Sequence, residues 1–249
     1  DPFVMPNPWD LGSAKVLAAL GAKALATTSS GFAFTRGFPD GAHITRDQHL
    51  DHAREIVEAT GLPVNGDFEN GYGRDPETVA ETVRLAAEAG LAGVGIEDID
   101  LPGDAAYPFD LAVARIEAAV EAARAADIVL TARADGWLTR AYDGDEAVRR
   151  AQAFADTGAD VIYAPLVKDD TIKALCKIGA PVNVLSAGPA LAHDVAGLAA
   201  MGVARVSIGG ALARATHKVL LDAGRALLSG DLAPLKAMAN GAEIDAMLS

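Results

Sequence analysis

Residues 62–73 read LPVNGDFENGYG, an apolar run that leads into an acidic, glycine-rich segment. Asp67 and Glu69 lie two residues apart, so in an extended strand both carboxylates point to the same side. Two such groups repel each other unless a cation, a proton or an arginine lies between them. The segment therefore predicts a strand end that offers oxygen ligands to a hard divalent cation, Mg²⁺ or Mn²⁺. The alternative is an acidic turn that caps the next helix, which residues 75–77 (DPE) would explain.

This segment is one unit of a longer pattern, in which short apolar runs alternate with amphipathic, alanine-rich runs. Such alternation predicts βαβ units and a parallel sheet. The eight predicted strands cover residues 3–6, 22–28, 63–69, 93–98, 128–135, 161–165, 181–185 and 206–209. The predicted helices cover residues 12–20, 46–60, 76–89, 110–125, 145–157, 169–177, 190–201 and 211–228. Glycines at positions 21, 61, 90, 158, 179 and 202 follow helices, where a left-handed C-cap favours glycine.

Eight strand–helix units predict an α/β fold of the (β/α)₈ TIM barrel type, whose usual size of about 250 residues suits this chain. A doubly wound open sheet is the competitor. It would normally show GxGxxG after the first strand, where residues 6–10 read PNPWD. We predict one barrel domain over residues 1–249, with residues 230–249 as a C-terminal helical extension.

The composition limits the possible partners. Hydrophobic residues make up 51% and charged residues 22%, which is ample for a core. The net charge of −13 argues against nucleic-acid and anionic-membrane partners. A single cysteine excludes a disulfide framework, and the sequence shows neither a leader pattern nor a long apolar run. These features lead us to expect a cytoplasmic protein.

In a barrel of this kind the C-terminal strand ends carry the chemistry. Polar and glycine residues gather at the predicted ends: Asn7, Trp9 and Asp10; Ser29, Ser30, Gly31 and Asp40; Asp67 and Glu69; Glu97 and Asp98; Arg133 and Asp135; Tyr163 and Pro165; Asn183 and Ser186; Gly209 and Gly210. Several acids and an arginine that converge on one rim predict a functional site, because a barrel without chemistry would scatter them.

Four motifs at these strand ends carry a family resemblance. They are ATTSSGFAFTRGFPDG at 26–41, GDFENGYG at 66–73, GIED at 95–98 and TARAD at 131–135. In this order they resemble the isocitrate lyase and phosphoenolpyruvate mutase superfamily. The resemblance implies a (β/α)₈ barrel that forms a homo-oligomer, a dimer or tetramer, with exchange of the last helix between subunits. It also implies small 2-oxo or 2-hydroxy carboxylate substrates, held by Mg²⁺ as a C–C or P–C bond breaks next to an enolate.

The resemblance also implies roles for individual residues. Asp67 matches the acid that binds the metal most directly, and Asp40, Glu69 and Glu97 match acids that hold its water shell. Ser29, Ser30 and Gly31 match the loop that grips the substrate carboxylate. Arg133 matches the arginine that neutralises substrate charge. We further expect Trp9 and Asn183 at the substrate, and count Arg133, Asp40 and Glu97 as catalytic.

Simpler interpretations of these residues remain open. Asp40 fits an ordinary turn, and Arg133 could pair structurally with Asp135 or Glu97. The three histidines at positions 43, 49 and 52 are predicted to face solvent, and Cys176 to be a buried thiol.

The chain also departs from the family. Residues 99–109 read IDLPGDAAYPF, without the Lys-Arg-Cys-Gly-His loop of the lyases or the Lys/Thr/Asn loop of mutases and phosphonopyruvate hydrolases. Pro165 stands where the lyases carry a glutamate. Loss of a general acid costs about 10²- to 10⁴-fold in rate, so a standard isocitrate or methylisocitrate lyase is not expected. Tyr107 is the one residue of this loop with a proton to give, although a rim aromatic explains it better.

The sequence therefore predicts a Mg²⁺-dependent enzyme that cleaves a C–C bond in a small 2-hydroxy or 2-oxo carboxylate. The first alternative is P–C chemistry, by a phosphonomutase or phosphonopyruvate hydrolase acting on a phosphonate. The second is a barrel that binds carboxylates without turnover.

Overall fold

The computed structural model describes residues 2–41 and 43–249, and its eight strands are all parallel. They are β1 (Phe3–Met5), β2 (Leu25–Ala26), β3 (Val64–Asp67), β4 (Gly93–Glu97), β5 (Val129–Arg133), β6 (Val161–Tyr163), β7 (Val182–Leu185) and β8 (Arg205–Ser207). The sheet order is β1-β8-β7-β6-β5-β4-β3-β2. The Ala26 N–H donates to the Pro6 carbonyl at 3.1 Å, and the Asn7 amide donates to the Thr27 carbonyl at 2.9 Å. These bonds join the first and last strands of the sheet, so the predicted (β/α)₈ barrel is confirmed.

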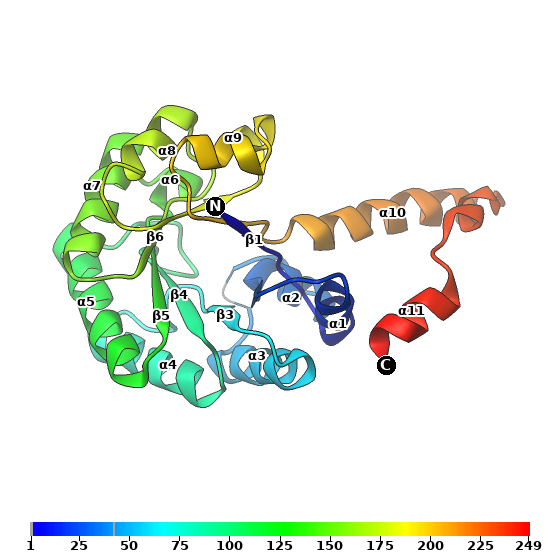
Figure 1. The fold of residues 1–249 in the computed structure, drawn as a ribbon, viewed down its shortest axis with the longest axis horizontal. Helices are drawn as coiled ribbons and strands as arrows, with labels where there is room; N and C mark the ends of the chain where they lie inside the picture. Colours follow the sequence, from blue (N-terminus) through cyan, green and yellow to red (C-terminus); the bar gives the residue numbers. More distant parts are fainter. Residues whose placement is uncertain (1, 42) are drawn as a thin grey trace.

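The helices before α10 cover the outside of this barrel, and the full set in chain order follows (Figure 1). They are α1 (Leu11–Ala19), α2 (Ser29–Thr35), α3 (Arg46–Thr60), α4 (Pro76–Glu88), α5 (Phe109–Ala126), α6 (Gly136–Thr139), α7 (Gly144–Asp156), α8 (Asp169–Leu175), α9 (Val195–Ala200), α10 (Ala211–Leu228) and α11 (Gly241–Leu248), with 3₁₀ helices η1 (Gly188–Ala192) and η2 (Ala233–Ala237). All six predicted C-cap glycines have positive φ values, from 62° at Gly61 to 98° at Gly158 and Gly202.

Two helical predictions need correction. Residues 29–31, expected in a loop, form the first turn of α2, because the Thr28 side chain accepts a hydrogen bond from the Gly31 N–H as an N-cap. Residues 190–201, expected as one helix, are divided between η1 and α9. The break lies at Asp194, whose side chain caps α9 by accepting from the Gly197 N–H.

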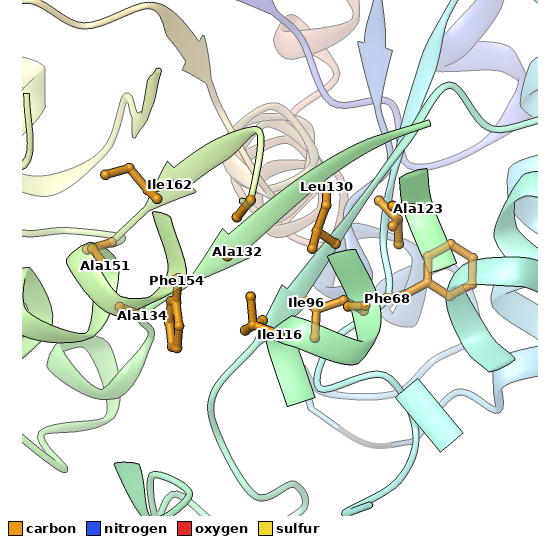
Figure 2. Packing of buried hydrophobic residues seen from close by; sticks show 14 of the residues in the cluster. Phe68, Ile96, Ile116, Ala123, Leu130, Ala132, Ala134, Ala151, Phe154 and Ile162 are labelled. Carbon is orange, nitrogen blue, oxygen red and sulfur yellow. The ribbon is translucent and has the colours of Figure 1, made fainter. Parts of the chain in front are cut away.

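Side chains alternate along each strand, and the outward set forms the hydrophobic core. Ile96, Leu130 and Ile162 point outward and pack beneath α5 and α7, where Figure 2 shows them beside Ile116 and Phe154. Each of these residues is fully buried. The inward set is much more polar, which leaves the barrel interior available for chemistry.

The C-terminal part of the chain leaves the barrel. Helix α10 projects away from it, and η2 and α11 follow in the region predicted as a helical extension (Figure 1). Helix α11 returns to α1, where the Lys15 ammonium donates to the Leu248 carbonyl at 2.7 Å. Among the helices of the described chain, none combines the length and apolar character that a membrane span requires.

Candidate active site

A cavity of about 430 Å³ opens at the C-terminal ends of the strands. Its walls bring together most of the predicted site residues, which are Ser29, Ser30, Asp40, Asp67, Glu69, Glu97, Arg133 and Asn183. Leu101 and Asp104 of the loop after β4 also line it, as do Leu138 after β5 and Leu166 after β6. The predicted convergence of acids and an arginine is therefore present in the fold.

Asp67, the last residue of β3, is held from two sides. Its Oδ2 accepts from the Ser29 backbone N–H at 2.9 Å and from the Ser29 hydroxyl at 2.8 Å. Its Oδ1 accepts from Arg133 Nη1 at 2.7 Å. Burial alone would raise the pKa of Asp67, but Arg133 and the two Ser29 bonds outweigh it, so the pKa lies below its usual value. Asp67 is therefore a carboxylate at neutral pH.

Arg133, at the end of β5, forms ion pairs with three carboxylates of the cluster. Its Nη2 pairs with Asp135 at 2.7 Å and with Glu97 at 2.9 Å, and its Nε donates to Asp135 at 3.1 Å. The guanidinium also lies 5.0 Å from the centroid of the Tyr163 ring. The structural pairing of Arg133 with Asp135 and Glu97 that we considered from sequence is thus confirmed. Its predicted role toward substrate charge must operate alongside these three carboxylate contacts.

The acids of this cluster outnumber their cation. Burial raises the pKa of Glu97 well above its usual value, and although Arg133 opposes this, Asp135, Asp67 and Glu69 raise the pKa further. The pKa of Asp135 is also raised, again chiefly by burial. A buried excess of carboxylates is stabilised by a proton or by an additional cation. The cluster therefore has the electrostatic character of a cation site.

Glu69 and Asp40 reach the cavity by different routes. Strand β3 ends at Asp67, and Glu69 has a left-handed backbone with φ of 49°, so strand alternation does not place Asp67 and Glu69 side by side as we predicted. Instead the chain turns at Glu69, and both side chains line the cavity. Asp40 lies in the segment after α2 and is exposed at the cavity, where partial desolvation of its carboxyl, followed by the charge of Asp67, raises its pKa.

The donor set suits a small hydrated cation. Within residues 2–41 and 43–249, no three His, Cys, Asp or Glu side chains converge tightly enough to surround an ion by themselves. Mg²⁺ gives up water reluctantly and commonly uses one or two carboxylates together with waters and substrate oxygens. The carboxylates that line this cavity are hard oxygen donors in excess of their cation, and they fit that mode of binding.

Ser29, Ser30 and Gly31 serve different purposes in the first turn of α2. The Ser29 N–H is used by Asp67, and the Gly31 N–H donates to Thr28 Oγ1 at 3.3 Å. The Ser30 hydroxyl lies 3.1 Å from Thr28 Oγ1 and faces the cavity. A side-chain carbon at position 31 would lie 2.8 Å from the Cβ of Trp9. Trp9 thus packs against the Gly31 backbone, and neither residue belongs to the cavity wall.

Asn183 of β7 leads to a residue that the sequence analysis missed. Its amide donates to Ser207 Oγ at 2.9 Å, and its Oδ1 accepts from Arg205 Nε at 2.9 Å. Arg205 is the first residue of β8 and lines the cavity. The predicted strand began one residue later, at 206, and so left this inward-facing arginine out.

Two of the three histidines do not face solvent as predicted. His49 and His52 lie on the inner face of α3 and are only 4% and 6% exposed, whereas His43 is exposed. His49 Nδ1 contacts the Tyr72 hydroxyl, and the His52 ring stacks on Phe32 with centroids 3.9 Å apart. Burial lowers the pKa of each histidine to about 4. Neither Nε2 atom has a hydrogen-bond partner among the described residues.

The loop after β4 keeps its tyrosine away from the reaction space. Tyr107 is 1% exposed, and its hydroxyl accepts from the Asn70 amide at 3.0 Å. The Arg115 guanidinium lies 4.0 Å from the centroid of its ring. Tyr107 is not part of the cavity wall, which agrees with an aromatic that anchors the loop better than with a proton donor.

Comparison with known proteins gives one family and several relatives. Residues 1–228 match the sequence profile of the phosphoenolpyruvate phosphomutase family. A protein of Burkholderia cenocepacia J2315, provisionally described as a lyase/mutase, has a crystal structure with a TM-score of 0.94 and 45% identity, covering 100% of this chain and 91% of that one. The 2,3-dimethylmalate lyase of Eubacterium barkeri is 33% identical over 168 residues, 64% of this chain and 57% of the lyase. Oxaloacetate acetylhydrolase in complex with its product oxalate superimposes with a TM-score of 0.86 and 26% identity, over 100% of this chain and 89% of the hydrolase.

Proposed function

This chain belongs to the phosphoenolpyruvate phosphomutase family, and from that premise we propose that it is a cytoplasmic, Mg²⁺-dependent enzyme that cleaves a C–C bond in a small 2-hydroxy or 2-oxo carboxylate. The observation that carries the proposal is the buried acid cluster at the strand ends. The pKa of Asp67 is lowered there, while burial and the neighbouring acids raise the pKa of Glu97 well above its usual value.

Each residue of the cluster has a definite part in this proposal. Asp67 binds the metal directly, and Asp40, Glu69 and Glu97 bind it through water. Bound Mg²⁺ would supply Lewis acidity to the oxygen on which negative charge develops. Arg133 holds the carboxylates of Asp67 and Glu97 in place. Ser30 orients the substrate carboxylate through its hydroxyl and through its N–H, which has no acceptor within the described chain.

One side of the cavity favours a carbon chain over a phosphoryl group as the part of the substrate that contacts it. Leu101, Leu138 and Leu166 line the side of the cavity formed by the loops after β4, β5 and β6. A phosphoryl group at that wall would need cationic partners, which these leucines do not supply. The relative named 2,3-dimethylmalate lyase supports the same choice. P–C chemistry remains the second candidate, because the family and the Burkholderia cenocepacia protein are described in part as mutases.

A substrate panel tests the proposal. Pyruvate or 2-oxo acid release from 2-alkylmalates and oxaloacetate would be measured beside phosphate release from phosphonopyruvate, each with and without Mg²⁺. We expect Mg²⁺-dependent C–C cleavage, and expect Asp67→Ala to abolish both turnover and Mg²⁺-dependent oxalate binding while the protein stays folded. Phosphate release alone would establish the P–C alternative. Tight Mg²⁺-dependent oxalate binding without any product would establish a binding protein instead.

We also propose that the enzyme is a homo-oligomer. Helix α10 projects from the barrel and exposes large apolar side chains that point in different directions around the helix: Val219 (68%), Leu220 (67%), Leu221 (52%) and Leu228 (93%). Large apolar side chains exposed around a projecting helix are unfavourable in water and are characteristic of a protein–protein interface. A second copy of the chain is the partner that the family resemblance suggests.

A further inference from the structure

The floor of the cavity is unusually polar for a barrel interior. Inward positions of (β/α)₈ barrels are normally filled by Val, Ile and Leu. Here the inward positions below the acid cluster include Asn65, Gly93, Gly95, Thr131, Asn183 and Arg205, beside the apolar Val161. A side-chain carbon at Gly95 would have its nearest neighbour, Arg133 Cδ, at 3.5 Å. The cavity therefore extends past Gly95 into the barrel, and Arg205 is part of its wall.

Among the described residues, Arg205 is a buried cation without an acidic partner. It is 8% exposed, and its guanidinium donates to Asn183 Oδ1 at 2.9 Å and to Thr131 Oγ1 at 2.8 Å, both neutral acceptors. Within the described residues it forms no ion pair. Burial lowers its pKa to about 10, so it still carries its charge at neutral pH. A buried charge that lacks a counter-ion is costly, and a guanidinium has five N–H donors of which two are used here.

The other buried arginines show how this chain normally satisfies such a group. Arg133 pairs with three carboxylates, and Arg150 pairs with Asp98 and Glu146. Arg115 has no acid, but it donates to three backbone carbonyls beneath an aromatic ring and does not face the cavity. Arg205 is the exception among these four, because it combines neutral partners with a position on the cavity wall.

We propose that Arg205 binds a second anionic group of the substrate, a carboxylate or phosphonate carried on the carbon chain beyond the metal-bound end. The proposal rests on the proposed function and narrows its substrate class to dianions. Arg133 is occupied by Asp67, Glu97 and Asp135, so it has less capacity for a second anion. Arg205 lies deeper on the opposite strands, free of competing acids, and its planar guanidinium suits either oxyanion.

The test compares pairs of ligands that differ only in the terminal group. Malate and 2-hydroxybutyrate share the 2-hydroxy carboxylate, but a methyl group replaces the second carboxylate in 2-hydroxybutyrate. Affinities would be measured calorimetrically at fixed Mg²⁺ for the unaltered protein and for Arg205→Met. We expect the unaltered protein to bind malate about 10- to 150-fold more tightly, the range for a charge-assisted contact. In Arg205→Met the two affinities should fall within about threefold of each other, with 2-hydroxybutyrate binding unchanged.

A third ligand and a matched variant make the result specific. 3-Phosphonolactate places a phosphonate where malate has its terminal carboxylate, so its rank against malate shows which anion Arg205 prefers. Arg214→Met is the control, since Arg214 also lines the cavity but is exposed at its mouth. Retention of the malate preference in Arg205→Met, or its loss in Arg214→Met alone, would overturn the proposal.

Two further outcomes are informative. Should Arg205→Met fail to fold, Arg205→Lys keeps the charge and should reduce the malate preference about threefold to tenfold. An unchanged preference in Arg205→Lys would contradict the proposal. Failure of the proposed function would give a different result, because the unaltered protein would then bind neither malate nor oxalate in a Mg²⁺-dependent way. That result would also overturn the proposed role of Arg205.

Discussion

Ser29 donates two hydrogen bonds to a single oxygen of Asp67, one from its backbone N–H at 2.9 Å and one from its hydroxyl at 2.8 Å. This pair fixes the end of β3 against the start of α2, two elements that are 38 residues apart in sequence. It also leaves the second oxygen of Asp67 shared between Arg133 and any metal. The orientation of the proposed metal ligand therefore depends on a residue first expected to bind substrate.

Ser29→Ala tests this dependence, because it removes the hydroxyl bond and keeps the backbone bond. Hydrogen bonds to charged groups contribute about 1.5–3 kcal/mol, so Mg²⁺-dependent oxalate affinity should fall about 10-fold or more. The fold should persist, since Ser29 is only half-buried. Calorimetry would measure the affinity, with Thr35→Ala on the same helix as the control. Equal oxalate affinity in Ser29→Ala and the unaltered protein would mean that Ser29 does not orient Asp67.

Arg133→Lys separates the effect of the positive charge from the effect of the guanidinium geometry in the acid cluster. A lysine keeps the positive charge but cannot contact Asp67, Glu97 and Asp135 together. We expect weaker oxalate binding and a loss of about 3 kcal/mol or more in the free energy of unfolding, because buried carboxylates lose a partner. Urea denaturation would measure the stability. The exposed variant Arg84→Lys, whose arginine forms a surface ion pair with Glu81, should change stability little. Similar stabilities for the two variants would show that the guanidinium geometry is unimportant.

The two buried histidines predict a loss of stability in mild acid. Their pKa values are about 4 in the folded protein and 6.5 for an exposed histidine, so the unfolded chain binds more protons. Above pH 6.5 the two histidines are neutral in both the folded and the unfolded protein and do not reduce its stability. As the pH falls from 6.5 toward 4, the free energy of unfolding decreases by an amount on the order of 3 kcal/mol for each histidine. Glu97 has the opposite shift, since its raised pKa favours the folded state at low pH. The comparison must therefore be made between variants at each pH.

His52→Leu should reduce the slope of the free energy of unfolding against pH by the equivalent of about one proton taken up on unfolding. Leucine retains the contact with Phe32 but cannot be protonated. The imidazole Nε2 has no hydrogen-bond partner within the described residues, so little is lost by its removal. Urea denaturation at pH 7, 6 and 5 would give the slope. Arg54→Gln, at an exposed position of the same helix, is the control. A slope in His52→Leu equal to that of the unaltered protein would mean that His52 is not protonated on unfolding.

Periodicity was sufficient to predict the barrel, whereas the details of the site depended on contacts between distant residues. All eight strands were predicted, because apolar runs such as residues 93–98 are short and bounded by glycine and acids. Helix α2 was not, since its N-cap Thr28 lies in a Thr-Thr-Ser-Ser run that also suits a loop. His49 and His52 were misplaced because polar residue types are normally exposed, whereas here aromatic rings that are distant in sequence, among them Phe32, Phe68 and Tyr72, pack against them.

Arg205 illustrates the same limit within the site. Its sequence context, between Ala204 and Val206, contains no motif, and its role depends on the strand register that places it beside Asn183. Conversely, Asp67 and Glu97 were predicted at the cavity because their motifs fall at strand ends, which the barrel brings together whatever the loops do.

The exposed apolar side chains of α10 lead to the last prediction. If a second copy covers this helix, Leu220→Glu places a charge in an apolar interface and should shift the protein to monomers at micromolar concentration. Leu191→Glu is a closely matched control, because Leu191 in η1 is also 67% exposed but lies outside the projecting helix. Light scattering after size-exclusion chromatography would report both masses. A monomeric unaltered protein, or an oligomer that survives Leu220→Glu, would show that the part of α10 around Leu220 is not the subunit interface. Within the described residues the barrel contacts α10 in its first half, at Ala213 and at His217, whose ring packs edge-on against Phe34. Leu220 lies beyond these contacts and is exposed, so the variant should remain folded and the change in mass would report assembly.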